Sequence, residues 1–103
     1  MATLTVLYWR DIPAQIVVKA GRRSAKRPLS PRFQEAIDAA AMRAGLAGTD
    51  DYLSAWRRGS PNDCGDDIEA EADTAAEQVE TDYPQTRLRT LVQAGGMRGE
   101  ASQ

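Results

Sequence analysis

The sequence contains no histidine and only one cysteine, Cys64. The first absence excludes imidazole general bases, histidine-containing catalytic dyads and the usual zinc sites, and the second excludes a disulfide framework. No uncharged stretch approaches the roughly 18 residues needed to span a bilayer, so no membrane partner is expected. We therefore expect a protein that is not an enzyme and that carries no cofactor and no metal.

The residues that are present are those of a small globular domain. The chain has 103 residues, of which 42% are hydrophobic and 27% charged, and this supports one modest core. We expect a single domain over residues 1–96 and a frayed tail over 97–103. The amino-terminal residues lack the basic flank and long apolar stretch of a secretory signal, and the lone cysteine suits a reducing compartment, so a cytoplasmic location is expected.

The charge is distributed unevenly along the chain. Residues 1–45 carry eight basic and three acidic residues, a net charge of +5, and residues 46–103 carry five basic and twelve acidic residues, a net charge of −7. This asymmetry predicts either attraction between the two halves or two surfaces of opposite sign. The isoelectric point near 5.1 argues against a dedicated nucleic-acid binder, for which a strongly basic domain is expected.

Two segments near the amino terminus have the pattern of strands. Residues 3–9 and 15–20 alternate polar with β-branched or aromatic residues, and the short link of residues 10–14 favours an antiparallel hairpin. A hairpin alone is marginally stable and has to be covered by helices. Its expected core face consists of Leu4, Val6, Tyr8, Ile16 and Val18.

The next segments indicate helices. Residues 21–29 form a basic connector, and Ser30-Pro31 is a typical helix start. Thr49 is the predicted cap of a second, shorter helix, although a third strand over residues 52–58 is the alternative. The inward-facing residues expected on these two helices are Phe33, Ile37, Ala40, Ala41, Ala44, Tyr52, Leu53 and Trp56.

An acidic helix is predicted over residues 66–83, after a loop at residues 61–65. Its apolar positions recur every three or four residues from Ile68 to Tyr83. Pro84 should end or kink this helix, and helical spacing then continues to Gly95-Gly96. The sequence thus predicts an α+β fold, an amino-terminal antiparallel β-hairpin packed against three to four α-helices.

The hairpin turn, the basic connector and the segment after the second helix hold the candidate partner-binding residues. Tryptophan and arginine are frequent in interface hot spots, and clustered cations bind phosphates. Two alternatives remain open: the connector pairs with the acidic helix of the same molecule, or Tyr8 is core, Trp9 lies over a helix and Asp11 caps the turn. The candidates are Trp9, Arg10, Asp11, Arg22, Arg23, Lys26, Arg27, Trp56, Arg57 and Arg58.

Two further features carry less chemistry. The acidic residues around Gly65 do not have the spacing of an EF-hand loop, so we interpret them as a solvated face. Cys64 has no histidine or second cysteine to activate it and is interpreted as incidental.

Five runs of the sequence are distinctive: residues 8–15 (YWRDIPAQ), 19–23 (KAGRR), Phe33 with 36–38 (AID), 50–53 (DDYL) and 56–59 (WRRG). Together they resemble the small bacterial virulence factor domain family over roughly residues 4–95. This family occurs as stand-alone alphaproteobacterial proteins and as a module of conserved virulence factor C proteins, beside an NFU-like domain and HEAT-like repeats. The family's name describes a phenotype, and the resemblance implies assembly with other proteins more than catalysis.

These observations lead to one functional hypothesis and one alternative, and a third hypothesis, an enzyme, would need a concave pocket with at least two convergent polar groups. The first is a non-enzymatic interaction domain, an adaptor or accessory subunit, that binds another protein. The alternative is binding of nucleic acid or a phosphorylated ligand through the same basic and aromatic residues.

Overall fold

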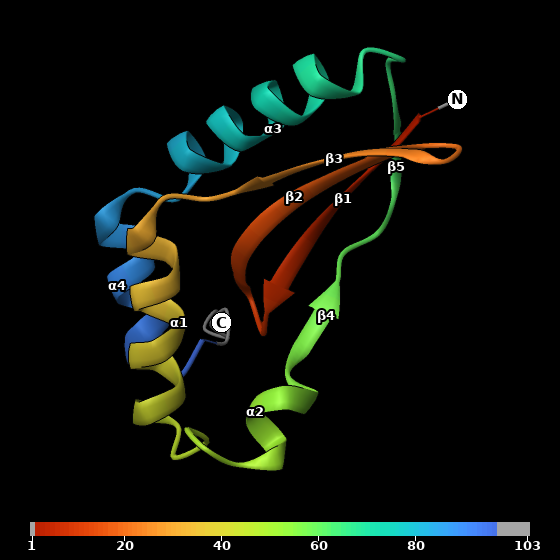
Figure 1. Cartoon of the computed structure of the whole chain (residues 1–103). Coiled ribbons are helices and arrows are strands. Elements are labelled where there is room, and N and C mark those ends of the chain that lie inside the picture. The colour runs from red at the N-terminus through yellow and green to blue at the C-terminus, as the bar shows by residue number, and fades with distance from the viewer. Residues whose placement is uncertain (1, 97–103) are drawn as a thin grey trace.

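The computed structural model describes residues 2–96, and the predicted tail at 97–103 lies outside them (Figure 1). The described residues form an antiparallel sheet of five strands and four helices, which confirms the predicted α+β class. In chain order the elements are β1 (Ala2–Trp9), β2 (Ile12–Ala20), β3 (Arg23–Pro28), α1 (Pro31–Arg43), α2 (Asp50–Ser54), β4 (Trp56–Arg58), β5 (Asn62–Cys64), α3 (Ile68–Asp82) and α4 (Gln85–Gln93).

The amino-terminal hairpin forms the centre of the sheet. β1 pairs with β2, β3 pairs with the other edge of β2, and β4 and β5 pair with the two ends of β1. The turn between β1 and β2 consists of Arg10 and Asp11 alone, because β2 begins at Ile12 and passes through Pro13. The link is therefore shorter than the predicted residues 10–14.

Two segments that were expected to be connections are strands. The basic connector contains β3, and the predicted loop at residues 61–65 contains β5. Both are polar and carry little strand propensity of their own. They pair because the backbone N–H and C=O groups along the edges of β2 and β1 need hydrogen-bond partners. The pattern of side chains in the sequence does not reveal this requirement.

The segment between residues 49 and 58 is first a helix and then a strand. Thr49 caps α2 as predicted, since its Oγ1 accepts a hydrogen bond from the Tyr52 N–H at 3.3 Å. β4 then pairs with residues 7–9 of β1, so the alternative strand is present over only three residues. Leu53, predicted to face inward, is 66% exposed, because the helix ends after five residues.

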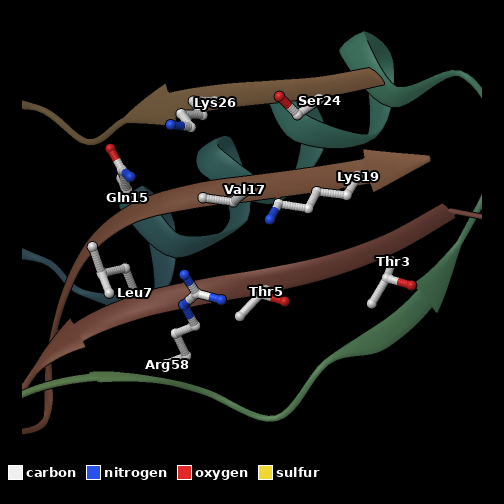
Figure 2. Close-up of a pocket in the computed structure, with 9 residues that line it drawn as sticks. All are labelled: Thr3, Thr5, Leu7, Gln15, Val17, Lys19, Ser24, Lys26 and Arg58. Carbon is white, nitrogen blue, oxygen red and sulfur yellow. The ribbon is translucent and has the colours of Figure 1, made fainter. Parts of the chain in front are cut away.

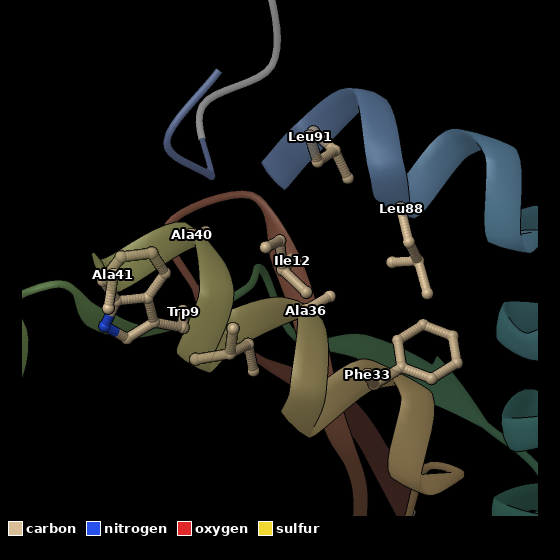
Figure 3. Packing of buried hydrophobic residues seen from close by; sticks show 9 residues of the cluster. Trp9, Ile12, Phe33, Ala36, Ala40, Ala41, Leu88 and Leu91 are labelled. Atoms are coloured by element: carbon tan, nitrogen blue, oxygen red, sulfur yellow. The ribbon is translucent and has the colours of Figure 1, made fainter. Parts of the chain in front are cut away.

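The helices bury two adjoining apolar clusters. α3 covers β2 and β3, and its Ile68 and Ala72 pack with Ile16, Val18 and Ala25. α1 and α4 pack together over the turn end of the hairpin, as Figures 1 and 3 show. The second cluster includes Trp9, Ile12, Phe33, Ala36, Ile37, Ala40, Ala41, Leu88 and Leu91, whereas Ala44 is only half-buried.

The prediction that Tyr8 is a core residue is wrong, whereas Trp9, predicted to lie over a helix, is in the same core cluster as Ala40 and Ala41 of α1. The pairing of β1 with β2 shifts register between Leu7 and Tyr8, a bulge that leaves Ala14 without a partner. The extra residue is on β2, and a bulge bends its strand and increases the local twist. Trp9 is fully buried, and Tyr8 belongs to neither core cluster.

The segment after α4 closes over the buried Trp9. Gly96 has a φ of +89°, and a Cβ atom at this position would lie 2.7 Å from Cζ3 of Trp9. The Asp11 N–H donates to the Gly96 carbonyl at 2.8 Å. Gly95-Gly96 thus ends the helix, as predicted, and also holds the hairpin turn against the helices.

We expect Gly96→Ala to destabilise the fold by about 2–4 kcal/mol, because it combines a left-handed backbone conformation with overpacking against Trp9. Gly48→Ala is the matched control, since Gly48 has a φ of +77° and open space around its Cα, and it should cost only about 1 kcal/mol. Urea unfolding of both variants measures the difference. Equal losses would show that the contact with Trp9 does not matter.

Candidate docking face

The face of the sheet opposite the helices is open and slightly hollow. Figure 2 looks onto it, with α3 behind the strands. Residues from four strands line a hollow of about 360 Å³. They are Thr3, Thr5, Leu7, Gln15, Val17, Lys19, Ser24, Lys26 and Arg58, and we call this surface the open face.

The open face combines a small apolar centre with positive charge. Leu7 and Val17 lie on the two central strands, and hydroxyl and amide side chains surround them (Figure 2). Lys26 lies on one flank and Arg58 on the other, and Lys19 lies on β2 toward its far end. The lining residues include no aspartate and no glutamate, so the cations of this face are not neutralised by their neighbours.

The cations of residues 2–96 divide into two groups. One group forms hydrogen bonds or ion pairs within the chain: Arg10, Arg27, Arg32, Arg43, Arg57 and Arg87. The side chains of the other group form neither within these residues: Lys19, Lys26 and Arg58 of the open face, Arg22 and Arg23 near its end, and Arg89 of α4. Three of these six unpaired cations therefore lie on the open face, whereas Arg23 alternates with Ser24 and belongs to the other side of β3.

The basic connector is divided by the alternation of β3. Ser24 and Lys26 line the open face, whereas Arg27 points to α3 and binds both Glu69 and Asp73. The Nε atom of Arg27 donates to Asp73 at 2.6 Å. The hydrogen bonds to Glu69 and then Asp73 raise the pKa of the Arg27 guanidinium above its usual value. The alternative that the connector pairs with the acidic helix is thus correct for Arg27.

The hairpin turn is held by internal contacts. Arg10 has a φ of +52°, rare for a residue with a side chain. Its N–H donates to the Ala55 carbonyl and its guanidinium to the Gly95 carbonyl, both at 3.0 Å. Arg57 donates to the Arg10 carbonyl at 2.9 Å and to Asp11 at 3.0 Å, and lies over the Tyr8 ring. These side chains chiefly fix the turn.

The ten candidate residues do not form one surface. Trp9 is fully buried, and its indole N–H donates to the Tyr52 carbonyl at 2.9 Å, so it is not available for stacking on a ligand. Trp56 is half-buried beside the Tyr52 ring. Arg10 and Arg22 lie at opposite ends of β2, which at 3.3 Å per residue separates them by about 25–30 Å.

A comparison with protein families identifies the chain. Residues 7–92 match the family described as virulence factor. The chain belongs to this family. No curated protein and no solved structure matches the chain.

In this virulence factor domain, the run from Tyr8 to Pro13 is mainly structural. Trp9, Ile12 and Pro13 are buried, and Arg10 and Asp11 form the locked turn. Sequence reasoning missed most of the open face, including Thr5, Gln15 and Val17. The signal was present, because the predicted core residues of β2 are even-numbered and the odd-numbered residues had to face the other side.

Other features of the virulence factor domain do not form sites. Within residues 2–96, no three cysteine, aspartate or glutamate side chains are grouped so that they could hold a metal ion, and no helix is long and apolar enough to cross a membrane. Cys64 is half-buried on β5. Burial raises the pKa of its thiol, and the negative charges of Glu71, Asp63 and Asp66 raise it further.

We expect replacement of the three open-face cations to leave stability almost unchanged. In the triple variant Lys19→Gln, Lys26→Gln, Arg58→Gln, each substitution should change the free energy of unfolding by less than about 0.5 kcal/mol, because these side chains have no internal partner. Arg57→Gln should cost about 1–2 kcal/mol, because it removes two hydrogen bonds and a cation–π contact. Chemical unfolding measures the free energies of unfolding of the two variants. A triple variant less stable than Arg57→Gln would show that the open-face cations serve the fold.

We also expect Cys64 to react slowly with a maleimide. The thiolate is the reactive form, so a raised pKa lowers its fraction at a given pH and moves the pH–rate midpoint upward. The midpoint should lie above that of the urea-unfolded chain, and Glu71→Gln should lower it. Identical midpoints for folded and unfolded protein would contradict the raised pKa.

Proposed function

We propose that this chain is a non-enzymatic protein-interaction domain of the cytoplasm, an adaptor or accessory subunit, and that its partner binds the open face. One observation carries the proposal: on this face, lysine and arginine side chains without an internal partner surround a half-buried apolar centre. Unpaired charge steers an oppositely charged partner and fixes its register, while the apolar centre supplies burial. The partner should therefore present acidic residues.

A protein fits this surface better than a nucleic acid. Proteins that bind single strands on a sheet face stack bases on exposed aromatic rings, and the residues lining the open face include no aromatic. The ring of Tyr8, which follows Leu7 in β1, is covered by the Arg57 guanidinium at 4.5 Å. The chain as a whole is also negative, with a net charge of −2.

The same lining supports a role in binding rather than catalysis. It pairs no carboxylate or thiol with a basic group, so it lacks the usual partners for acid–base or nucleophilic chemistry. The open hollow also does not shield a reacting group from water. The cytoplasmic location is supported by the unpaired thiol of Cys64.

A photo-crosslinking amino acid at position 17, in the centre of the open face, tests the proposal in the native host. Irradiation should give a covalent product with a distinct protein, identified by mass spectrometry. The same product should disappear when Lys19 and Lys26 are both changed to glutamate, since charge reversal repels an acidic partner.

The control carries the crosslinker at Leu53, which is 66% exposed but belongs to α2 rather than to the open face. It should not give this product. The proposal fails if Val17 forms no protein product, if charge reversal leaves the product unchanged, or if nucleic acid is what becomes attached.

A further inference from the structure

The edges of the sheet are poorly suited to accept a partner strand. On β3, the Lys26 carbonyl accepts a hydrogen bond from the Arg27 guanidinium at 2.9 Å, and Pro28 has no N–H to donate. On the opposite side, β4 and β5 have three residues each. Short edges, prolines and edge charges are the features that prevent strand addition. A partner of the open face therefore lies on the sheet and not beside it.

A segment lying on a sheet face gains no backbone hydrogen bonds from the strands below it. Its N–H and C=O groups must be satisfied within the segment itself, and an α-helix does this. The open face has the width for one helix. From β3, which carries Lys26, to β4, which carries Arg58, there are three strand spacings, or about 14 Å, and a helix with its side chains is about 10–12 Å across.

The opposite face of the same sheet shows how such a helix docks. There the apolar stripe of α3, with Ile68 and Ala72, packs on Ile16 and Val18 of β2 and on Ala25 of β3. Its flanking carboxylates, Glu69 and Asp73, are one helical turn apart and both bind Arg27 of β3. An acidic amphipathic helix is thus held by apolar contact along its centre and by a β3 cation at its side.

The open face repeats this arrangement without the helix. Val17 on β2 and Leu7 on β1 provide the apolar centre, Lys26 is the neighbour of Arg27 on β3 with its side chain on the open face, and Lys19 and Arg58 add further positive charge. Lys26 has no internal carboxylate partner, whereas Arg27 has two.

We infer that the open face docks an acidic amphipathic α-helix of a partner protein, with its apolar stripe on Leu7 and Val17 and its carboxylates beside Lys19, Lys26 and Arg58. This inference rests on the proposed function and specifies its ligand. The bound helix would complete a layer on the second side of the sheet, so that helices cover both faces.

A designed peptide of about 18 residues, long enough to form a helix in isolation, tests the inference. It carries a leucine stripe flanked by glutamates, and fluorescence anisotropy with the full chain measures its affinity. Binding should weaken as salt rises from about 50 to 300 mM. Lys26→Glu should weaken it at least about fivefold, because an attractive charge pair becomes a repulsive one. Val17→Glu should abolish binding by placing a charge in the apolar centre.

Arg89→Glu is the matched control, because it makes the same change in net charge at an unpaired cation of α4. It should leave affinity within about twofold, since its charge is screened from the open face. A peptide of the same composition without the leucine stripe should bind more weakly. Amide shifts on peptide addition should concentrate at residues of β1 and β2, such as Thr5 and Val17.

The inference is overturned if the striped peptide does not bind, if Lys26→Glu and Arg89→Glu weaken it equally, or if a single-stranded oligonucleotide binds the open face more tightly. These results are distinct from failure of the proposed function. Protein crosslinks from position 17 without peptide binding would overturn only the helical ligand, whereas absence of such crosslinks would remove the docking face itself.

Discussion

Along β2 and β3, successive side chains point to opposite faces of the sheet, and both surfaces of the molecule depend on this alternation. Ile16, Val18 and Ala25 face the helices and form one cluster of the core with α3. Val17 and Lys26, one residue away, line the open face. A register slip of one residue would exchange these sets, placing a lysine in the core and an isoleucine in water. The apolar residues that stabilise the fold therefore also fix which cations remain exposed.

The elements with a strong apolar period could be predicted from the sequence. β1, β2, α1 and α3 all show one, and the stripe of α3 from Ile68 to Val79 packs where it was expected. β3 and β5 could not be predicted in this way, because polar residues such as Ser24 and Asp63 become strand residues only when a distant strand offers its edge. Pairing is a non-local interaction, and a local pattern does not contain it.

The sequence predicts that the candidate site contains cations, but it does not predict which cations form it or where they lie. The excess of cations in the first half of the chain is evident, yet nothing in the run Lys26-Arg27 shows that one side chain binds α3 and the other does not. That distinction requires the register of β3 against β2 and the position of α3 behind it. The burial of Trp9 rather than Tyr8 is hidden for a related reason, since the bulge at Ala14 interrupts the regular pairing of β1 with β2 beside these residues and leaves no mark in composition.

The fold explains in part why the two halves of the chain carry opposite net charges. Arg27 and Arg32 from the basic half bind Glu69, Asp73 and Glu80 of α3, which attaches the acidic helix to the rest of the domain. The positive charge left over is concentrated in part on one sheet face, where Lys19, Lys26 and Arg58 have no internal partner. Surface charge pairs contribute little affinity individually, and their main effects are on association rate and specificity. Under the proposed function, a shallow hollow with such charges around it would favour a partner that associates quickly and dissociates readily.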